Sequence, residues 1–326
     1  MEQPLLSVRD VRMVFQSRKG NFPAVDGLSF DLSQGEILGI VGESGSGKTM
    51  TSLTVMNLLP GQGKIERGEI LYQGRDLRKL NDREMCRIRG KEISMIFQDP
   101  MMSLDQVYTV GSQMTEAILA HEKFPKEKLK ERCLALLDSV GIANPERVFN
   151  SYPFQLSGGM CQRVMIAIAL SCDPMLLIAD EPTTALDVTV QAQILELLEK
   201  IRTERNIGII LITHDLDVVE DMADRIMVMY AGKVMETAPK DVLFSDPRHM
   251  YTKGLLSSVP RMDSGGRLHS IPGVVPDIRA MPEGCRFCTR CPRADERCAR
   301  QAPPMLEVGP QHFAACWYGR EEEQRG

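Results

Sequence analysis

One short segment of the chain has the residue types and the spacing of a phosphate-binding loop. It reads Gly42-Glu43-Ser44-Gly45-Ser46-Gly47-Lys48-Thr49 and lies between an apolar run (37–41) and a helix-like stretch (49–59). Glycines permit a tight loop whose backbone N–H groups point at phosphates, and the following helix adds the positive end of its dipole. We expect Lys48 to neutralise the β- and γ-phosphates and the Thr49 hydroxyl to bind Mg²⁺. A chance glycine-rich turn is the alternative, which the strand-to-helix setting disfavours.

A second segment ends an apolar run in two acids. Leu176 to Ala179 is followed by Asp180 and Glu181. We expect Asp180 to hold Mg²⁺, directly or through water, and Glu181 to polarise the attacking water as general base. Two acids after a strand are more often only a solvated strand end, but a complete phosphate loop in the same chain reverses that preference. His214, directly after the apolar run 209–213, is expected to contact the γ-phosphate.

Composition and the lengths of the apolar runs argue against several classes of partner and several cellular locations. The net charge is −5, and the Lys and Arg residues form no cluster, so we expect no nucleic-acid partner. The apolar runs are far shorter than the roughly 20 residues that span a bilayer. The first residues, Met1 to Pro4, include no basic region before an apolar core, so no secretory signal and a cytoplasmic address are expected.

The apolar pattern indicates the elements that must position these residues. Residues 5–41 alternate like strands and predict an antiparallel β edge that leads into a buried strand, whereas 110–150 has helical spacing and predicts an inserted helical subdomain. The runs 175–179 and 207–213 are typical of central parallel strands, and 188–202 predicts the helix between them. This alternation predicts an α/β core. Prolines become frequent after about 240, where we place a domain boundary.

A glycine-containing signature then defines the family that the chain resembles. It reads Leu156-Ser157-Gly158-Gly159-Met160, followed by Cys161-Gln162-Arg163. Together with Gln98, with Ala185-Leu186-Asp187 and with His214, it resembles in order and spacing the nucleotide-binding subunits of ABC transporters. The resemblance implies a RecA-like P-loop core with an antiparallel β edge and a helical subdomain at about 99–172, together forming a domain over 1–240. It also implies that two such domains pair head to tail, with ATP between the P-loop of one and the signature of the other.

The resemblance assigns further residues to the nucleotide. Ser157 offers a hydroxyl, and the N-terminus of the helix expected over 164–170 would face the γ-phosphate of the partner chain, although an ordinary N-capped helix is the alternative. Phe15 is implied to stack on adenine, or else is a core strand residue. Gln98 is implied to link the nucleotide and Mg²⁺ to the subdomain that receives a coupling helix from the membrane subunit. The implied nucleotide-binding set is Phe15, Gly42, Ser44, Gly45, Ser46, Gly47, Lys48, Thr49, Met50, Gln98, Asp180, Ser157, Gly158 and Gly159.

The sequence departs from the family pattern in three places. Residues 99–105 resemble the peptide importers, which typically have Leu-Asn-Pro where this chain has Leu104-Asp105-Gln106. Cys161 replaces a more usual Ser or Arg and would be sensitive to oxidation if exposed. Met250 replaces Pro in a segment that resembles His-Pro-Tyr-Thr. The first departure affects the local turn after Leu104 but no catalytic group.

Five of the nine cysteines lie close together near the C-terminus, in a segment (245–318) that resembles the extension of peptide- and nickel-importer ATPases. Four thiolates can bind a [4Fe–4S] cluster or a tetrahedral Zn²⁺. The resemblance favours the cluster, bound by Cys285, Cys291, Cys298 and Cys316. A local C-x₂-C-x₂-C pattern makes Cys288 an alternative ligand, and free thiols are the other possibility. We therefore expect 241–326 to be a small irregular Cys-rich domain held together by a cluster.

These features predict an ATP-hydrolysing subunit that powers an ABC importer for dipeptides or oligopeptides. A nickel or metal-chelate importer is the alternative. An exporter fits the C-terminal segment less well, and a soluble ABC ATPase acting on nucleic acid or ribosomes would usually carry two cassettes, a long coiled coil or a basic arm. The resemblance implies a second, non-identical ATPase, two transmembrane permease subunits and an extracellular or periplasmic solute-binding protein as partners. It places the chain, as a peripheral subunit, at the cytoplasmic face of the cell (inner) membrane.

Overall fold

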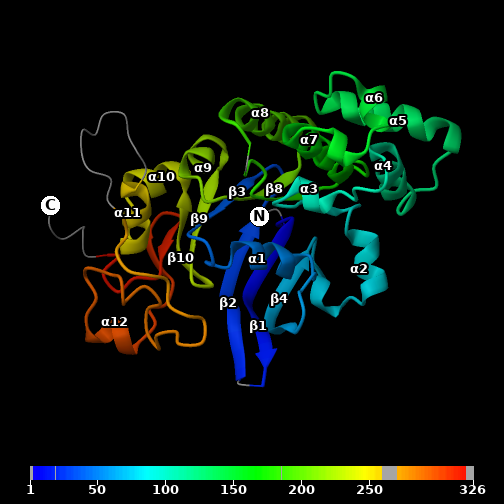
Figure 1. Cartoon of the computed structure of the whole chain (residues 1–326). Helices are drawn as coiled ribbons and strands as arrows, with labels where there is room; N and C mark the ends of the chain where they lie inside the picture. Colours follow the sequence, from blue (N-terminus) through cyan, green and yellow to red (C-terminus); the bar gives the residue numbers. More distant parts are fainter. Residues whose placement is uncertain (1–2, 19, 185, 259–269, 321–326) are drawn as a thin grey trace. The chain divides into compact units, whose positions relative to one another are not determined.

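The computed structural model describes residues 3–18, 20–184, 186–258 and 270–320. Ala185, 259–269 and 321–326 lie outside the described residues, and with them the first residue of the segment Ala185-Leu186-Asp187 and two parts of the expected C-terminal domain. The chain, whose helices and strands Figure 1 labels, forms two compact units. The first unit contains 1–32, 37–78 and 213–326, and the second contains 33–36 and 79–212.

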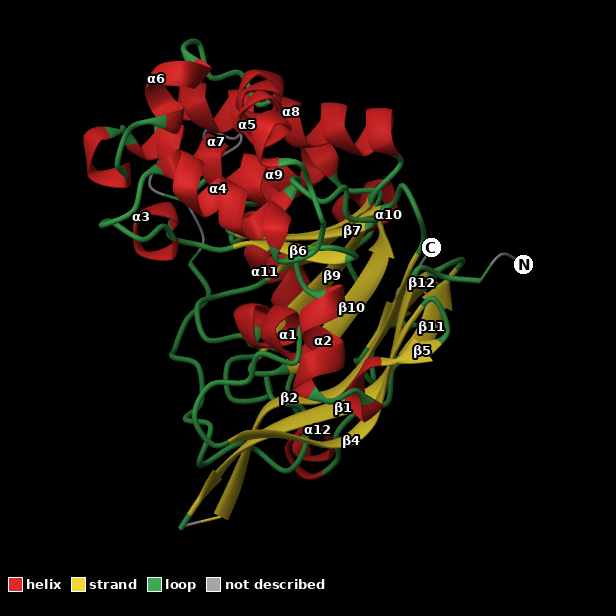
Figure 2. Cartoon of the chain, turned by 90° about the vertical axis from the view of Figure 1, so that its right-hand side faces the viewer, coloured by secondary structure: helices red, strands yellow, loops and turns green. Residues whose placement is uncertain are grey.

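An antiparallel sheet opens the first unit. Its strands are β1 (Leu6–Ser17), β2 (Gly20–Leu32), β4 (Gly63–Tyr72) and β5 (Arg75–Asp76), in the order β2-β1-β4-β5. Figure 2 shows β1 between β2 and β4, and it pairs antiparallel with both. The expected antiparallel β edge is therefore present in this unit.

A second group of strands in the first unit combines one strand from the early part of the chain with four from its later part. The strands are β3 (Ile37–Val41), β9 (Arg225–Tyr230), β10 (Lys233–Pro239), β11 (Leu306–Gly309) and β12 (His312–Ala314). β3 and β9 are parallel, and β10 pairs antiparallel with both β9 and β12. The segment after 240 thus adds strands to the sheet that contains β3. The helices of this unit are α1 (Lys48–Val55), α9 (Leu216–Met222), α10 (Lys240–Ser245), α11 (Met250–Ser257) and α12 (Glu296–Arg300).

The second unit contains the expected parallel strands. β6 (Ile93–Ile96), β7 (Leu176–Asp180) and β8 (Gly208–Ile212) are buried along their whole length, and β7 pairs in parallel with the other two. The helix α8 (Val188–Arg205) connects β7 to β8, as a parallel crossover requires. Uniform burial explains why these strands are continuous apolar runs instead of alternating ones.

The remaining helices of the second unit include the three, α4 to α6, that the spacing over 110–150 predicts. They are α2 (Asp82–Ile88), α3 (Pro100–Ser103), α4 (Val110–Leu119), α5 (Lys126–Ser139), α6 (Pro145–Phe149) and α7 (Gly158–Ala169), with a 3-10 turn at Pro153–Gln155. Another 3-10 turn, Leu77–Lys79, lies where the chain passes from the first unit to the second. α7 packs against α3, α4 and α5. Met114, Ile118, Leu137 and Val140 are buried, which is the face that their spacing predicts. Within the described residues, no helix combines the length and the apolar character needed to cross a bilayer.

Candidate functional site

In the first unit, the glycine-rich loop connects the buried strand β3 to α1, as expected (Figure 1). Gly42, Gly45 and Gly47 have positive φ angles of 154°, 77° and 99°. A Cβ atom at Gly42 would lie 2.1 Å from the Met229 carbonyl oxygen, and one at Gly47 would lie 2.9 Å from the Ala24 oxygen. The loop therefore requires glycine at these positions, both for its backbone conformation and for its close approach to neighbouring strands.

Lys48 lies inside this loop, almost completely buried. Its Nζ donates hydrogen bonds to the carbonyl oxygens of Gly42, at 2.7 Å, and Glu43, at 3.3 Å. The Ser46 hydroxyl is buried and has no hydrogen-bond partner among the described residues. Thr49 is exposed at the start of α1. A lysine cation, an unpartnered buried hydroxyl and an exposed threonine hydroxyl thus surround a loop of the shape that binds phosphate.

His214 belongs to the same unit and lies beside the end of β3. The Thr213 N–H donates to the Ile40 carbonyl oxygen at 3.2 Å, which brings the chain next to the strand that leads into the loop. The Asp215 carboxylate then accepts from Asp217 N–H at 3.0 Å and caps α9. His214 is therefore an exposed residue between the end of a strand and a capped helix, and its contact with the γ-phosphate remains a prediction.

In the second unit, two of the expected residues are in direct contact. Asp180 is buried at the carboxyl end of β7, and Glu181 follows it in the left-handed region, with φ 48°. The Glu181 carboxylate accepts from Gln98 Nε2 at 3.0 Å and from the Thr184 hydroxyl at 2.9 Å. A non-glycine residue in this conformation is uncommon and is found at functional sites more often than elsewhere. Sequence reasoning missed Thr184, although its hydroxyl three residues after Glu181 was a usable signal.

The signature residues form the exposed N-terminus of α7. This helix begins at Gly158, so the expectation that it begins at 164 was wrong by more than one turn. The Ser157 hydroxyl caps it weakly, since it accepts from Met160 N–H at 3.4 Å, whereas Ser157 and Gly158 stay exposed. A Cβ atom at Gly159 would lie 2.8 Å from a Val190 methyl group, so this glycine permits close packing. Both roles considered for Ser157, helix cap and anion contact, fit this geometry.

Two other expected nucleotide contacts are partly exposed residues of the first unit. Phe15 lies on β1, where it pairs with Phe22 of β2, and its side chain does not belong to the buried core. Met50 lies in the first turn of α1. Partial exposure leaves Phe15 free to stack, as a core strand residue would not be. Its adenine contact and that of Met50 remain predictions.

The three departures from the family pattern are accommodated locally. The Asp105 side chain accepts from Val107 N–H at 3.0 Å, and Gln113 bonds both backbone groups of Asp105, so side chains hold the turn. Met250 is the first residue of α11, a position that favours proline but does not need it. Cys161 is buried against the Pro153 carbonyl, and burial raises its pKa, so the exposure needed for easy oxidation is absent.

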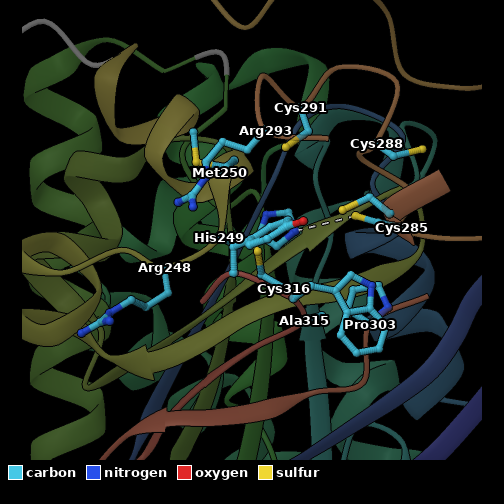
Figure 3. A pocket seen from close by; sticks show the side chains of 13 residues that line it. Arg248, His249, Met250, Cys285, Cys288, Cys291, Arg293, Pro303, Ala315 and Cys316 are labelled. Carbon is cyan, nitrogen blue, oxygen red and sulfur yellow. Dashed lines mark hydrogen bonds between the residues drawn. The ribbon is translucent and has the colours of Figure 1, made fainter. Parts of the chain in front are cut away.

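The five C-terminal cysteines line one pocket of the first unit (Figure 3). His249 also lines it, and its Nε2 lies 4.0 Å from Cys285 Sγ. In Figure 3 the Cys288 sulfur points away from those of Cys285, Cys291 and Cys316. Burial raises the pKa of Cys285 to about 12, so this thiol is neutral at pH 7 without a bound cation. The described residues contain no group of three or more His, Cys, Asp or Glu side chains placed to hold a metal ion, so no preformed metal site supports the predicted cluster.

A buried acid ties this pocket to the sheet. Glu236 of β10 accepts from the backbone N–H groups of Arg248 and His249, at 2.7 and 2.8 Å, and from His312 Nε2 at 2.7 Å. Burial lowers the pKa of His249 to about 4, and its Nδ1 accepts from Tyr251 N–H, which leaves the proton of the neutral ring on Nε2. The start of α11 and strand β12 are thereby held against β10.

Comparisons with known proteins agree with this arrangement. The family model described as ABC transporter matches residues 25–184, and the one described as oligopeptide/dipeptide transporter, C-terminal region, matches 235–298. The oligopeptide transport ATP-binding protein OppD of Bacillus subtilis (strain 168) is 50% identical over 96% of this chain and 88% of its own. The dipeptide transport ATP-binding protein DppD of the same strain is 49% identical, over 97% and 95%. The dimeric ATP-binding cassette MJ0796, solved in a post-hydrolysis state with ADP and Pi, is 28% identical over 72% of this chain and 98% of its own, with a TM-score of 0.65.

Fold and glycine-rich loop together define an ATP-binding protein of the ABC transporter class. More narrowly, the chain belongs to the family of oligopeptide and dipeptide transporter ATP-binding proteins. The resemblance drawn from the signature is thus confirmed, as is the ABC ATPase fold with its antiparallel sheet and helices. The separate Cys-rich domain after 240 stays a prediction.

Proposed function

We propose that the chain binds Mg-ATP through the loop 42–49 and hydrolyses it, with Glu181 as general base, to power peptide import. The observation that carries this proposal is the Glu181 carboxylate, held by an amide and a hydroxyl directly after a buried aspartate. Thr49 and Asp180 would hold the Mg²⁺, which when bound neutralises charge on the phosphates. Because the Gln98 amide donates to Glu181, its carbonyl oxygen is left for the metal shell.

Each remaining residue then has one task. Lys48 balances phosphate charge, as expected for a lysine at the start of α1, and the His214 imidazole donates to the γ-phosphate. Glu181 accepts the proton of the attacking water while Gln98 and Thr184 keep its carboxylate oriented. Hydrolysis of ATP by the purified chain, alone or in complex, is the direct test. Failure to bind ATP at all would overturn the proposal.

Replacing Thr184 with valine tests the orientation of the base. Valine keeps the shape of threonine but removes the hydroxyl that donates to Glu181, so kcat should fall about tenfold with little change in ATP affinity. Steady-state ATPase kinetics measure both. Thr203→Val is a matched control, because that hydroxyl bonds the Glu199 carbonyl on α8 instead. Equal kcat values for Thr184→Val and the parent would contradict the orienting role.

The signature supports a head-to-tail pair with a second ATPase, which we propose to be a non-identical paralogue. The N-terminus of α7 is exposed, and the helix has 12 residues, so its positive end is available to an anion outside this chain. Ser157, Gly158 and Gly159 would contact the γ-phosphate bound by the partner. The solved dimeric cassette with ADP and Pi is a relative that pairs. This pairing comes to our chain as an inference from that relative.

Exposed apolar side chains of the second unit support docking to a permease subunit. They follow β6 and extend to the start of α4, and they are Phe97, Met101, Met102, Val107 and Tyr108. Apolar side chains gathered along one exposed stretch mark an interaction surface more often than chance exposure does. We propose that this stretch receives the coupling helix of a transmembrane permease, and that the chain is a peripheral subunit at the cytoplasmic face of the cell (inner) membrane.

The substitution Met102→Glu should weaken that docking. Met102 is 85% exposed, so the substitution leaves the fold intact but places a charge in an apolar contact. Association with permease subunits, measured by co-purification from membranes, should fall about tenfold or more. Val274→Glu is the matched control, because Val274 is 84% exposed but lies in the first unit. Equal co-purification of both variants would contradict the assignment.

For the solute, the curated relatives named for oligopeptides and dipeptides favour peptides over nickel or metal chelates. The ATPase chain does not contact the solute in this class, so its own residues discriminate little. Reconstitution with the permease pair and the solute-binding protein provides the test. Stimulation of ATP hydrolysis by peptides and not by nickel supports the peptide assignment, and the reverse contradicts it.

We also propose that Cys285, Cys291, Cys298 and Cys316 bind a [4Fe–4S] cluster, with Cys288 as the alternative ligand. Support comes from the pocket that these thiols share. A single Zn²⁺ needs thiolate sulfurs that all lie about 2.3 Å from the one metal ion, whereas thiols spread around a pocket suit a polynuclear group. Iron and sulfide analysis of anaerobically purified protein provides the test. Zinc without iron, or neither metal, would contradict the cluster.

A further inference from the structure

Arg290, in the cysteine segment, forms a bidentate ion pair with the nucleotide loop. Its Nη1 and Nη2 atoms donate to the two carboxylate oxygens of Glu43, at 2.7 and 3.1 Å. Its Nε donates to the Pro272 carbonyl oxygen at 2.9 Å, and Nη2 also bonds that of Ile271 at 3.2 Å. The guanidinium is almost completely buried, and Nη1 also donates to the Tyr230 hydroxyl at 3.3 Å. These bonds fix the position of the planar fork and therefore that of the Glu43 carboxylate.

The backbone of Glu43 is held by the same part of the molecule. Its N–H donates to the Tyr251 hydroxyl at 2.8 Å, and its carbonyl oxygen accepts from Lys48. Tyr251 is buried, with ring centroids 4.7 Å from Tyr230 and 5.3 Å from Phe287. Phe287 lies three residues before Arg290. One short segment therefore supplies both the ion pair with Glu43 and an aromatic ring that packs against Tyr251, which bonds the Glu43 backbone.

A second arginine of the segment supports the other end of the loop. Arg286 is buried and donates to the Asp26 carboxylate at 2.8 Å and to the Ala231 carbonyl oxygen. The next residue, Gly232, donates its N–H to the Ser46 carbonyl oxygen at 2.7 Å. The turn between β9 and β10 thus connects Arg286 to Ser46, directly before the glycine and lysine that end the loop.

We propose that the segment Cys285–Cys291 is a clamp that sets the conformation of the nucleotide loop, with Arg290 as its positioning residue through Glu43. The inference rests on the proposed ATP site. Arg286 and Arg290 alternate in the segment with Cys285, Cys288 and Cys291, which line the thiol pocket (Figure 3). A change that moves these thiols must therefore also move one or both arginines. By linkage, the order of the thiol pocket and the affinity for ATP depend on each other.

The pair can be tested by a double-mutant cycle with Arg290→Gln, Glu43→Gln and the double variant. Removal of a charged partner leaves the loop unfixed, so the dissociation constant for ATP and KM should each rise about tenfold while kcat stays within about twofold. The double variant should be no weaker than the worse single one, because both changes break the same contact. Arg290→Lys, which keeps the charge but not the fork, should fall between parent and glutamine variant. Equilibrium binding and steady-state kinetics supply these values.

Arg300→Gln is the matched control, since this arginine of the same C-terminal part is exposed and pairs with Glu296. It should bind ATP like the parent. Unchanged ATP affinity in Glu43→Gln and Arg290→Gln, or additive effects in the double variant, overturns the clamp. If a thermal melt shows that Arg290→Gln is not folded, the ATP affinity of Glu43→Gln still tests the clamp, because the Glu43 side chain is partly exposed. A parent chain that binds no ATP contradicts the proposed function instead, so the two failures are distinguishable.

Discussion

Replacing Glu181 with glutamine should leave ATP binding intact and reduce hydrolysis by about 10²- to 10⁴-fold. Glutamine has the size of glutamate, and its carbonyl oxygen can still accept from the Gln98 amide and the Thr184 hydroxyl. It cannot accept the proton of the attacking water at neutral pH. The change therefore removes the proposed chemical step without removing the contacts that shape the site.

Two measurements separate this effect from misfolding. The dissociation constant for ATP should match that of the parent, and kcat for the assembled complex should fall to a residual rate. Glu196→Gln is a matched control, because Glu196 is an exposed glutamate of α8 in the same unit. Hydrolysis by Glu181→Gln at the rate of the parent would show that another group takes the proton.

The nucleotide loop could be predicted from the sequence because all its determinants are local. An apolar strand, three glycines with positive φ and a lysine at the start of a helix lie within one short stretch. The buried parallel strands were equally readable, since full burial requires continuous apolar runs. In both cases the residues that define the feature are neighbours in the chain.

The contacts that support those residues could not be predicted in the same way. Arg290 and Glu43 are 247 positions apart, and no local pattern assigns one of many arginines to one of many acids. The start of α7 was missed because two glycines normally disfavour a helix, yet Gly159 is needed there for packing against Val190. The cysteine spacing indicated a shared site, but only coordinates could show that all five thiols line one pocket without converging on one point.

Replacing Lys48 with alanine should weaken ATP binding about 10- to 100-fold and lower turnover at sub-saturating ATP by at least the same factor. Lys48 is the buried cation of the nucleotide loop, and its Nζ bonds two carbonyl oxygens of that loop. Alanine removes the charge that balances the phosphates and leaves the carbonyl oxygens of Gly42 and Glu43 without this donor. Both effects act on the ground state, so KM should rise more steeply than kcat falls.

Lys240→Ala is the control that separates loss of the cation that neutralises phosphate from loss of hydrogen bonds to the backbone. Lys240 also bonds two backbone carbonyl oxygens, those of Glu220 at 2.8 Å and Asp221 at 3.4 Å, but it is the first residue of α10, and its partners lie near the end of α9. If Lys48 acted only through its hydrogen bonds to the backbone, both variants would lower the melting temperature and neither would change the affinity for ATP. The phosphate role requires that only Lys48→Ala loses ATP affinity, while Lys240→Ala changes thermal stability at most. Equal affinities would refute the role of Lys48 and, with it, the assignment of this loop as the ATP site.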